Sequence, residues 1–183
     1  MISTWKRTVL GCAAIIFYIA HAATWIQRHA ASNLLWTCHL GCLLVGVAIL
    51  ARWPLANAVG VLWLILGNII WSIHLANGGE FIMTSQLTHL GGLLLGLWSI
   101  RQAGFPRGSW LAALAGLAVL HILSGFITAP SENVNLAFRV WSGWEKTFPD
   151  FHVYRLFMLA VSAVLFFALE LAARRFLVGA EKR

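Results

Sequence analysis

Long apolar segments separated by short polar breaks dominate this chain. Six segments come close to the roughly 20 apolar residues that a bilayer-crossing helix needs; they cover residues 9–26, 33–51, 55–76, 84–100, 109–128 and 151–171. The breaks between them carry the glycine, proline and charge that end helices, as in Ala-Arg-Trp-Pro at 51–54. The pattern predicts an all-α polytopic membrane protein folded as a bundle of six transmembrane helices.

Length and composition agree with a single transmembrane domain over residues 1–183. The chain is 60% hydrophobic and 10% charged, its mean hydropathy is +0.80, and the one sizeable connection is 129–150. That connection carries Val134, Phe138, Trp141 and Trp144. Large apolar residues in a loop indicate a segment lying along the membrane surface, as a short interfacial helix or a lid.

The distribution of lysine and arginine predicts the orientation, because these residues are retained on the cytoplasmic side. Nine of the 13 fall on one side of the predicted spans: Lys6, Arg7, Arg52, Arg101, Arg107, Arg174, Arg175, Lys182 and Arg183. Both termini are therefore expected in the cytoplasm. The net charge of +7 indicates this topology and attraction to anionic lipid headgroups, and it does not indicate nucleic-acid binding.

The N-terminus also resembles a signal peptide. Lys6 and Arg7 precede an apolar run, and Ala-His-Ala at 20–22 resembles a cleavage site. The apolar run continues to Ile26, which favours an uncleaved first span.

All seven histidines fall in the outer half of this topology: His21, His29, His39, His74, His89, His121 and His152. Buried ionisable groups are costly in a membrane and tend to face a cavity. We therefore expect a polar site beneath the outer surface, although each histidine taken alone also suits a hydrogen bond to a neighbouring helix.

Other polar residues are predicted at the same depth. Thr37 and Cys38 begin the second span, and Ser85 shares a helical face with His89, followed by Gly92 and Gly96, which permit close helix packing. Cys38 and Cys42 lie one helical turn apart, which suits neither a disulfide nor a structural zinc site. Cys38 is then a buried thiol, or a nucleophile if a histidine takes its proton.

Arg155 lies about one turn inside the outer end of the last span. It can hold a substrate carboxylate or phosphate, or it can anchor the helix by pairing with Asp150, Glu132 or Glu80.

Four motifs carry a family resemblance. They are Leu-Trp-Thr-Cys-His-Leu at 35–40, Ser-Gln-Leu-Thr-His-Leu at 85–90, Asn-Val-Asn-Leu-Ala-Phe at 133–138 and Phe-Pro-Asp-Phe-His-Val-Tyr at 148–154. Together they resemble the YwaF-like bacterial integral membrane proteins, which are similar to the androgen-induced-protein and ether-lipid acyltransferase proteins of animals. The resemblance implies a bacterial cytoplasmic (inner) membrane protein acting on membrane lipids.

The resemblance also implies intramembrane hydrolysis or transfer of lipid acyl groups, with Cys38 as nucleophile and His89 as base. Both residues are expected about 8 Å below the outer surface, the depth of a lipid ester. Thr37, Ser85, Asn133 and Asn135 are candidate donors to an oxyanion. His39, His74, His121 and Arg155 are expected to support the site. No cofactor is needed for this chemistry.

Two other classes of function stay open. Paired histidines from different helices can bind haem or a transition metal, with His21, His39, His74, His89 and His121 as candidate ligands. A small transporter is less favoured, because the polar layer is confined to one leaflet and no broken helices recur in two halves.

Overall fold

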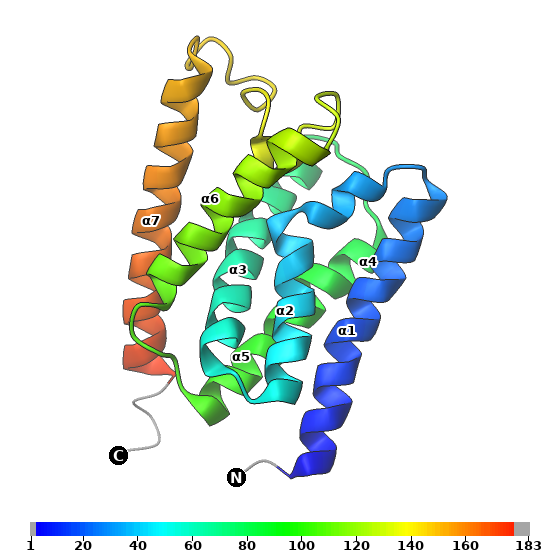
Figure 1. Cartoon of the computed structure of the whole chain (residues 1–183), viewed down its shortest axis with the longest axis vertical. Coiled ribbons are helices and arrows are strands. Elements are labelled where there is room, and N and C mark those ends of the chain that lie inside the picture. Colours follow the sequence, from blue (N-terminus) through cyan, green and yellow to red (C-terminus); the bar gives the residue numbers. More distant parts are fainter. Residues whose placement is uncertain (1–2, 178–183) are drawn as a thin grey trace.

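The computed structural model describes residues 3–177 and confirms the all-α prediction. Helices make up 78% of it, and no strand occurs among the described residues. The main helices run up and down, so that α1 begins and α7 ends at the same end of the bundle (Figure 1).

The helices form six rods, each overlapping one predicted apolar segment. Five are single helices: α1 (Thr4–Gln27), α2 (Thr37–Ala51), α3 (Pro54–Ala76), α6 (Ser109–Ile127) and α7 (Phe151–Phe176). The remaining rod joins α4 (Met83–Gln86), the π-helical turn η2 (Leu87–Gly91) and α5 (Gly92–Ala103). Two 3-10 turns, η1 (Ala31–Leu35) and η3 (Val134–Leu136), lie in the connections.

Four helices, α1, α3, α6 and α7, are long and apolar enough to cross a membrane. These four are typical of an integral membrane protein. Helix α2 is apolar but has 15 residues.

Two predicted boundaries are wrong, for local reasons. Helix α1 begins at Thr4 rather than residue 9, because the Ser3 side chain accepts a hydrogen bond from the Lys6 backbone N–H and caps the first turn. The second span does not run unbroken from residue 33, because Trp36 has extended backbone angles (φ −55°, ψ 132°) between η1 and α2. Asn33 lies instead in the 3-10 turn η1, where its carbonyl oxygen accepts from the Trp36 N–H at 3.2 Å.

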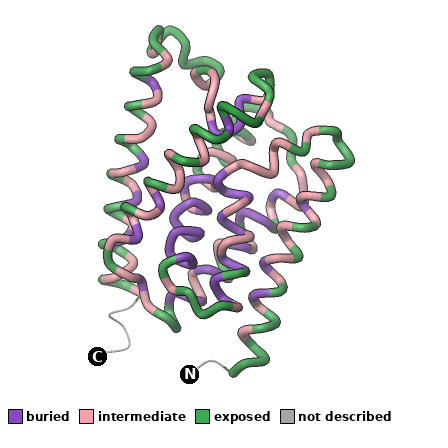
Figure 2. The backbone as a smooth tube through the Cα atoms, in the orientation of Figure 1, coloured by how far each residue is buried: buried purple, intermediate pink, exposed green. Residues whose placement is uncertain are grey.

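Glycines allow α1, α2 and α3 to pack closely. A Cβ atom built on Gly60 would lie 2.8 Å from the Gly41 carbonyl oxygen, and one on Gly46 would lie 2.9 Å from the Gly11 carbonyl oxygen. Small residues at such contacts are the usual means of helix association in membranes. Figure 2 shows the buried positions concentrated in the middle of the bundle, on α2 and α3.

The predicted packing role of Gly92 and Gly96 is confirmed. A Cβ atom on Gly92 would lie 2.8 Å from the Cys42 sulfur, and one on Gly96 would lie 2.4 Å from a Val61 methyl group. Helix α5 is thus held against both α2 and α3.

At the opposite end of the bundle from the α1–α2 connection, a buried carboxylate ties α7 to α6. Glu170 is 5% exposed and accepts hydrogen bonds from the backbone N–H groups of Gly108 (3.0 Å) and Trp110 (3.0 Å). It caps the start of α6, where the helix dipole favours an anion. Arg174 lies 3.8 Å from the same carboxylate, which agrees with the pairing expected from their spacing.

The 129–150 connection is not an interfacial helix. Its regular structure is limited to η3, where Val134 is 0% exposed and Asn135 is 8% exposed. The apolar side chains are accommodated by packing on the bundle and on one another, as when Trp144 stacks on Phe148 with ring centroids 5.8 Å apart.

We expect Gly60→Ala to destabilise the protein by about 1–3 kcal/mol, because the added methyl group pushes α2 away from α3. Thermal unfolding in detergent micelles measures the effect. Gly125→Ala is the matched control, since Gly125 lies in α6 with nothing within 4 Å of its added Cβ. Equal melting temperatures for Gly60→Ala and wild type would contradict the proposed packing.

Candidate functional site

Three of the histidines lie together where α1 ends and α2 begins. They come from three rods: His21 from α1, His39 from α2 and His89 from η2. Their exposed fractions are 0%, 5% and 2%. The rings of His21 and His39 have centroids 4.3 Å apart, and those of His39 and His89 lie 5.5 Å apart. We call these three residues with Cys38 the histidine cluster.

His21 is held by two partners. Its Nδ1 lies 3.0 Å from the Thr84 hydroxyl, and its Nε2 accepts a hydrogen bond of 2.8 Å from the Trp25 indole N–H. Since Nε2 accepts, the ring proton is assigned to Nδ1, which donates to Thr84.

His39 is oriented by the break before α2. Its Nδ1 lies 2.7 Å from the carbonyl oxygen of Asn33, and a carbonyl oxygen can only accept, so Nδ1 carries the proton. The Nε2 atom points instead at His21, with 3.0 Å between the two Nε2 atoms.

His89 lies in the π-helical turn, a rare element that is frequent at functional sites. Its Nδ1 donates to the Ser85 carbonyl oxygen at 2.8 Å and lies 3.2 Å from the Ser85 hydroxyl. The ring stacks on Trp71, with centroids 5.3 Å apart and planes 8° apart. With Nδ1 protonated, Nε2 is left as an available base or ligand.

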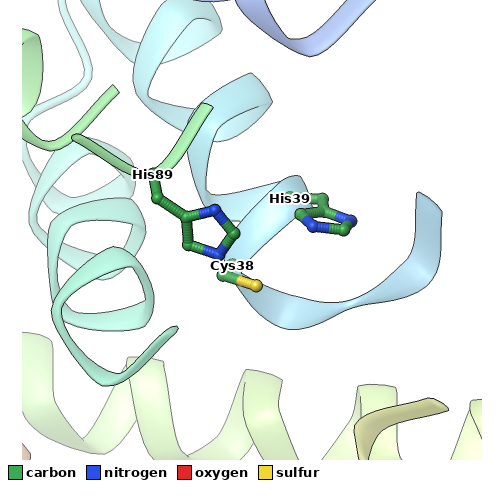
Figure 3. Close-up of side chains that lie close together, drawn as sticks. All are labelled: Cys38, His39 and His89. Atoms are coloured by element: carbon green, nitrogen blue, oxygen red, sulfur yellow. The ribbon is translucent and has the colours of Figure 1, made fainter. Parts of the chain in front are cut away.

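Cys38 completes the cluster. One potential ligand atom from each of Cys38, His39 and His89 lies within 4.8 Å of the other two (Figure 3). Cys38 can lie there because Gly67 of α3 faces it: a Cβ atom on Gly67 would fall 2.1 Å from the Cys38 Cβ. As predicted, Cys38 and Cys42 form no disulfide, and the Cys42 thiol donates to the Ala14 carbonyl oxygen.

Cys38 lies on the wall between two grooves. One groove contains His39, Ser85, His89 and the rim residues His74 and Glu80. The other runs between α2, α3, α6 and α7 and is largely apolar. Its lining includes Leu66, Ile70, Leu117, Met158 and Leu159, with Arg155 and His121 among its ionisable groups. Cys38 thus contributes to the lining of both grooves.

The other four histidines lie outside the histidine cluster, in different surroundings. His121 lies in the apolar groove, where its Nδ1 donates to the Asn135 carbonyl oxygen at 3.0 Å and its buried Nε2 has no partner. His74 is exposed at the rim of the polar groove, and His29 and His152 are exposed. The seven histidines therefore do not share one chamber.

The polar groups of Thr37, Asn133 and Asn135 are occupied by structural hydrogen bonds. The Asn135 side chain accepts from the Thr37 N–H and hydroxyl and donates to the Leu35 carbonyl oxygen and the Ser124 hydroxyl. Asn133 accepts from the N–H groups of Phe138 and Arg139. Asn135 thus fastens the 129–150 connection to the start of α2, and Asn133 closes a turn within that connection. The Ser85 hydroxyl differs from these groups in lying 3.2 Å from His89 Nδ1.

Arg155 does not pair with any of the acids considered from the sequence. Asp150 caps α7 by accepting from the His152 N–H, Glu132 accepts from the Ser32 hydroxyl, and Glu80 pairs with Arg28. The Arg155 guanidinium lies 5.6 Å from the Phe151 ring and lines the apolar groove. It is thus available to a ligand there.

A bidentate ion pair at the groove rim was not predicted. Arg28, just after α1, donates to both Glu80 oxygens at 2.6 and 2.7 Å. The Arg28 guanidinium lowers the pKa of the Glu80 carboxyl below its ordinary value of 4.5, chiefly through these hydrogen bonds. The two residues are 52 positions apart, so neither helical spacing nor the motifs indicate their contact.

The contribution of this pair should depend on pH. Because the Glu80 pKa is lowered on folding, its stabilisation is present above pH 4.5 and is lost as the pH falls through the lowered pKa. The melting temperature of wild type should therefore be slightly higher than that of Glu80→Gln at pH 7, and this difference should disappear at acidic pH. Arg28→Gln is the control and should lose the same increment. A wild-type advantage that persists below pH 3 would contradict the assignment.

Comparisons with known proteins do not assign the chain to a family. No family model matches the chain, no curated protein matches it, and no solved structure matches it. The function must therefore be argued from the geometry of the histidine cluster and its two grooves.

Proposed function

We propose that the protein is an intramembrane lipid hydrolase or acyltransferase, with Cys38 as nucleophile and His89 as general base. The observation that carries the proposal is the placement of the Cys38 sulfur within 4.8 Å of a His89 nitrogen, on the wall of an apolar groove. A gap of this size is bridged by one water or closes with a small side-chain movement. The YwaF-like resemblance of the sequence motifs points to the same pair.

The ring of His89 is prepared for proton transfer. Its Nδ1–H donates to the Ser85 carbonyl oxygen and its face rests on Trp71, so that the unprotonated Nε2 is held in a fixed orientation. An imidazole fixed by a hydrogen bond at one nitrogen serves as base through the other.

The proposed reaction proceeds in two balanced steps. In the first, the Cys38 thiol gives its proton to His89 Nε2, the sulfur bonds to the ester carbonyl carbon, and the carbon–oxygen bond breaks as the alcohol leaves with that proton. In the second, water or a second lipid hydroxyl attacks the thioester, and its proton returns through His89 to the sulfur. The Ser85 hydroxyl, 3.2 Å from His89 Nδ1, is the proposed donor to the developing oxyanion.

The apolar groove suits the acyl chain of a membrane lipid. Its walls are largely hydrocarbon, Cys38 lies at one side, and Arg155 offers a cation to a carboxylate or phosphate. This placement would let one substrate contact Arg155 through its polar group and Cys38 through its ester.

We propose a bacterial cytoplasmic membrane as the location, with all six rods crossing it and both ends of the chain in the cytoplasm. The excess of lysine and arginine at the end where α1 begins supports this orientation. The histidine cluster would then face the outer leaflet.

Transport is less well supported. Along α2 the buried residues Cys42 and Val45 separate the cluster from the crevice at the opposite end, and along α3 the buried residues Val61, Leu62 and Leu64 do the same. These apolar side chains interrupt a polar path through the bundle.

Cys38→Ala should abolish hydrolysis of a medium-chain p-nitrophenyl ester, and His89→Gln should slow the labelling of Cys38 by a thiol-reactive probe carrying a fatty acyl chain. His89→Gln should lower the hydrolysis rate by about 10²- to 10⁴-fold, the usual contribution of a general base. Labelling is measured by mass spectrometry and hydrolysis by release of p-nitrophenol.

Cys42→Ala is the matched control, because Cys42 lies one turn further along α2 and contacts neither groove. It should retain wild-type labelling and hydrolysis. Undiminished ester hydrolysis by a folded Cys38→Ala, His89→Gln double variant would reject the proposed pair.

A further inference from the structure

Two unprotonated ring nitrogens lie close together in the histidine cluster. His39 Nδ1 donates to the Asn33 carbonyl oxygen, so His39 Nε2 is unprotonated in the neutral ring. His21 Nε2 accepts from the Trp25 indole N–H, so it is unprotonated as well, and its lone pair is used by that hydrogen bond. These two Nε2 atoms lie 3.0 Å apart, and two acceptors at that distance repel each other unless a proton or a metal ion lies against both.

The third histidine repeats this arrangement. His89 also donates Nδ1–H to a backbone carbonyl oxygen and keeps a free Nε2. Metal-binding histidines typically donate the second ring N–H to a carbonyl, a hydroxyl or a carboxylate, which fixes the tautomer and aims the other nitrogen at the ion. All three histidines have such an acceptor, from Thr84, Asn33 and Ser85 respectively.

We propose that the histidine cluster binds one divalent transition-metal ion through His21, His39 and His89, with the Cys38 thiolate as fourth ligand. Zinc bonds of 2.0–2.3 Å in a tetrahedral site place neighbouring ligand atoms about 3.3–3.6 Å apart. The His21 and His39 Nε2 atoms, 3.0 Å apart, lie slightly closer than this range, and ligand atoms of Cys38, His39 and His89 all lie within 4.8 Å of one another. Side-chain rotations that turn His21 and Cys38 toward the same ion would complete the site.

The ligand chemistry selects the class of ion. Imidazole nitrogen and thiolate sulfur suit zinc, cobalt, nickel or copper, whereas magnesium and calcium require oxygen ligands. Haem does not fit between His21 and His39, because a macrocycle cannot enter between nitrogens 3.0 Å apart with rings at 81°. When the ion binds, Cys38 releases its thiol proton to solvent. The hydrogen bond from the Trp25 indole N–H to His21 Nε2 breaks, so that this nitrogen can bind the ion.

The site does not depend on the proposed acyl chemistry. It uses the same Cys38 and His89, so a bound ion would occupy the nucleophile and the base and would inhibit that reaction. The polar groove, lined by His74, Glu80 and Trp25, gives the ion a path from the rim to the cluster.

Cobalt(II) binding to the purified full-length protein in nanodiscs tests the proposal. Wild type should bind about one Co²⁺ per chain and show a thiolate-to-cobalt charge-transfer band. Cys38→Ser should keep the ion and lose the band. His39→Gln should bind at least about tenfold more weakly. His121→Gln is the matched control, since His121 lies in the other groove, and it should bind as wild type does.

Protection of the cysteines provides a second measurement that is independent of variant folding. Zn²⁺ should slow alkylation of Cys38 in wild type, and a chelator should restore the rate, while the exposed Cys12 reacts equally in both conditions. Failure of folded wild type to bind Co²⁺, or unchanged Cys38 alkylation with Zn²⁺, would overturn the metal site. Binding of Co²⁺ by a protein without esterase activity would support the metal site and reject the proposed enzyme.

Discussion

Close contact between helices at glycine is the constraint on which this structure depends. Gly41 and Gly60 bring α2 against α3, Gly11 and Gly46 bring α1 against α2, and Gly92 brings α5 against Cys42. In a membrane, apolar side chains gain little by leaving lipid for protein, so packing at short distance must hold the helices together. The same short distances place imidazoles from three rods within reach of one another.

The backbone then fixes the histidines. His39 is oriented by the carbonyl of Asn33 in the 3-10 turn η1, and His89 is oriented by the carbonyl of Ser85 in α4. In both residues the backbone acceptor holds the Nδ1 proton and leaves Nε2 unprotonated. An imidazole prepared in this way suits both a general base and a metal ligand, which is why one cluster supports the acyl chemistry and the metal site proposed above.

Cys38 has a special position because it belongs to both grooves. It contacts the polar side with the histidines and the apolar side with Arg155, and Gly67 makes room for it. His121 has no such position: the asparagine-rich η3 segment holds it in the apolar groove. Residues at similar depth on the sequence-based topology therefore separate into different surroundings.

The sequence by itself determined the six apolar segments and the helical class, because hydrophobic length and helical geometry are local properties. It also indicated that Gly92 and Gly96 pack against other helices. Only the tertiary structure decided that His21, His39 and His89 meet while His121 does not, since the rotation of each helix about its axis depends on its neighbours. The Arg28–Glu80 pair likewise joins residues 52 positions apart, which no local pattern connects.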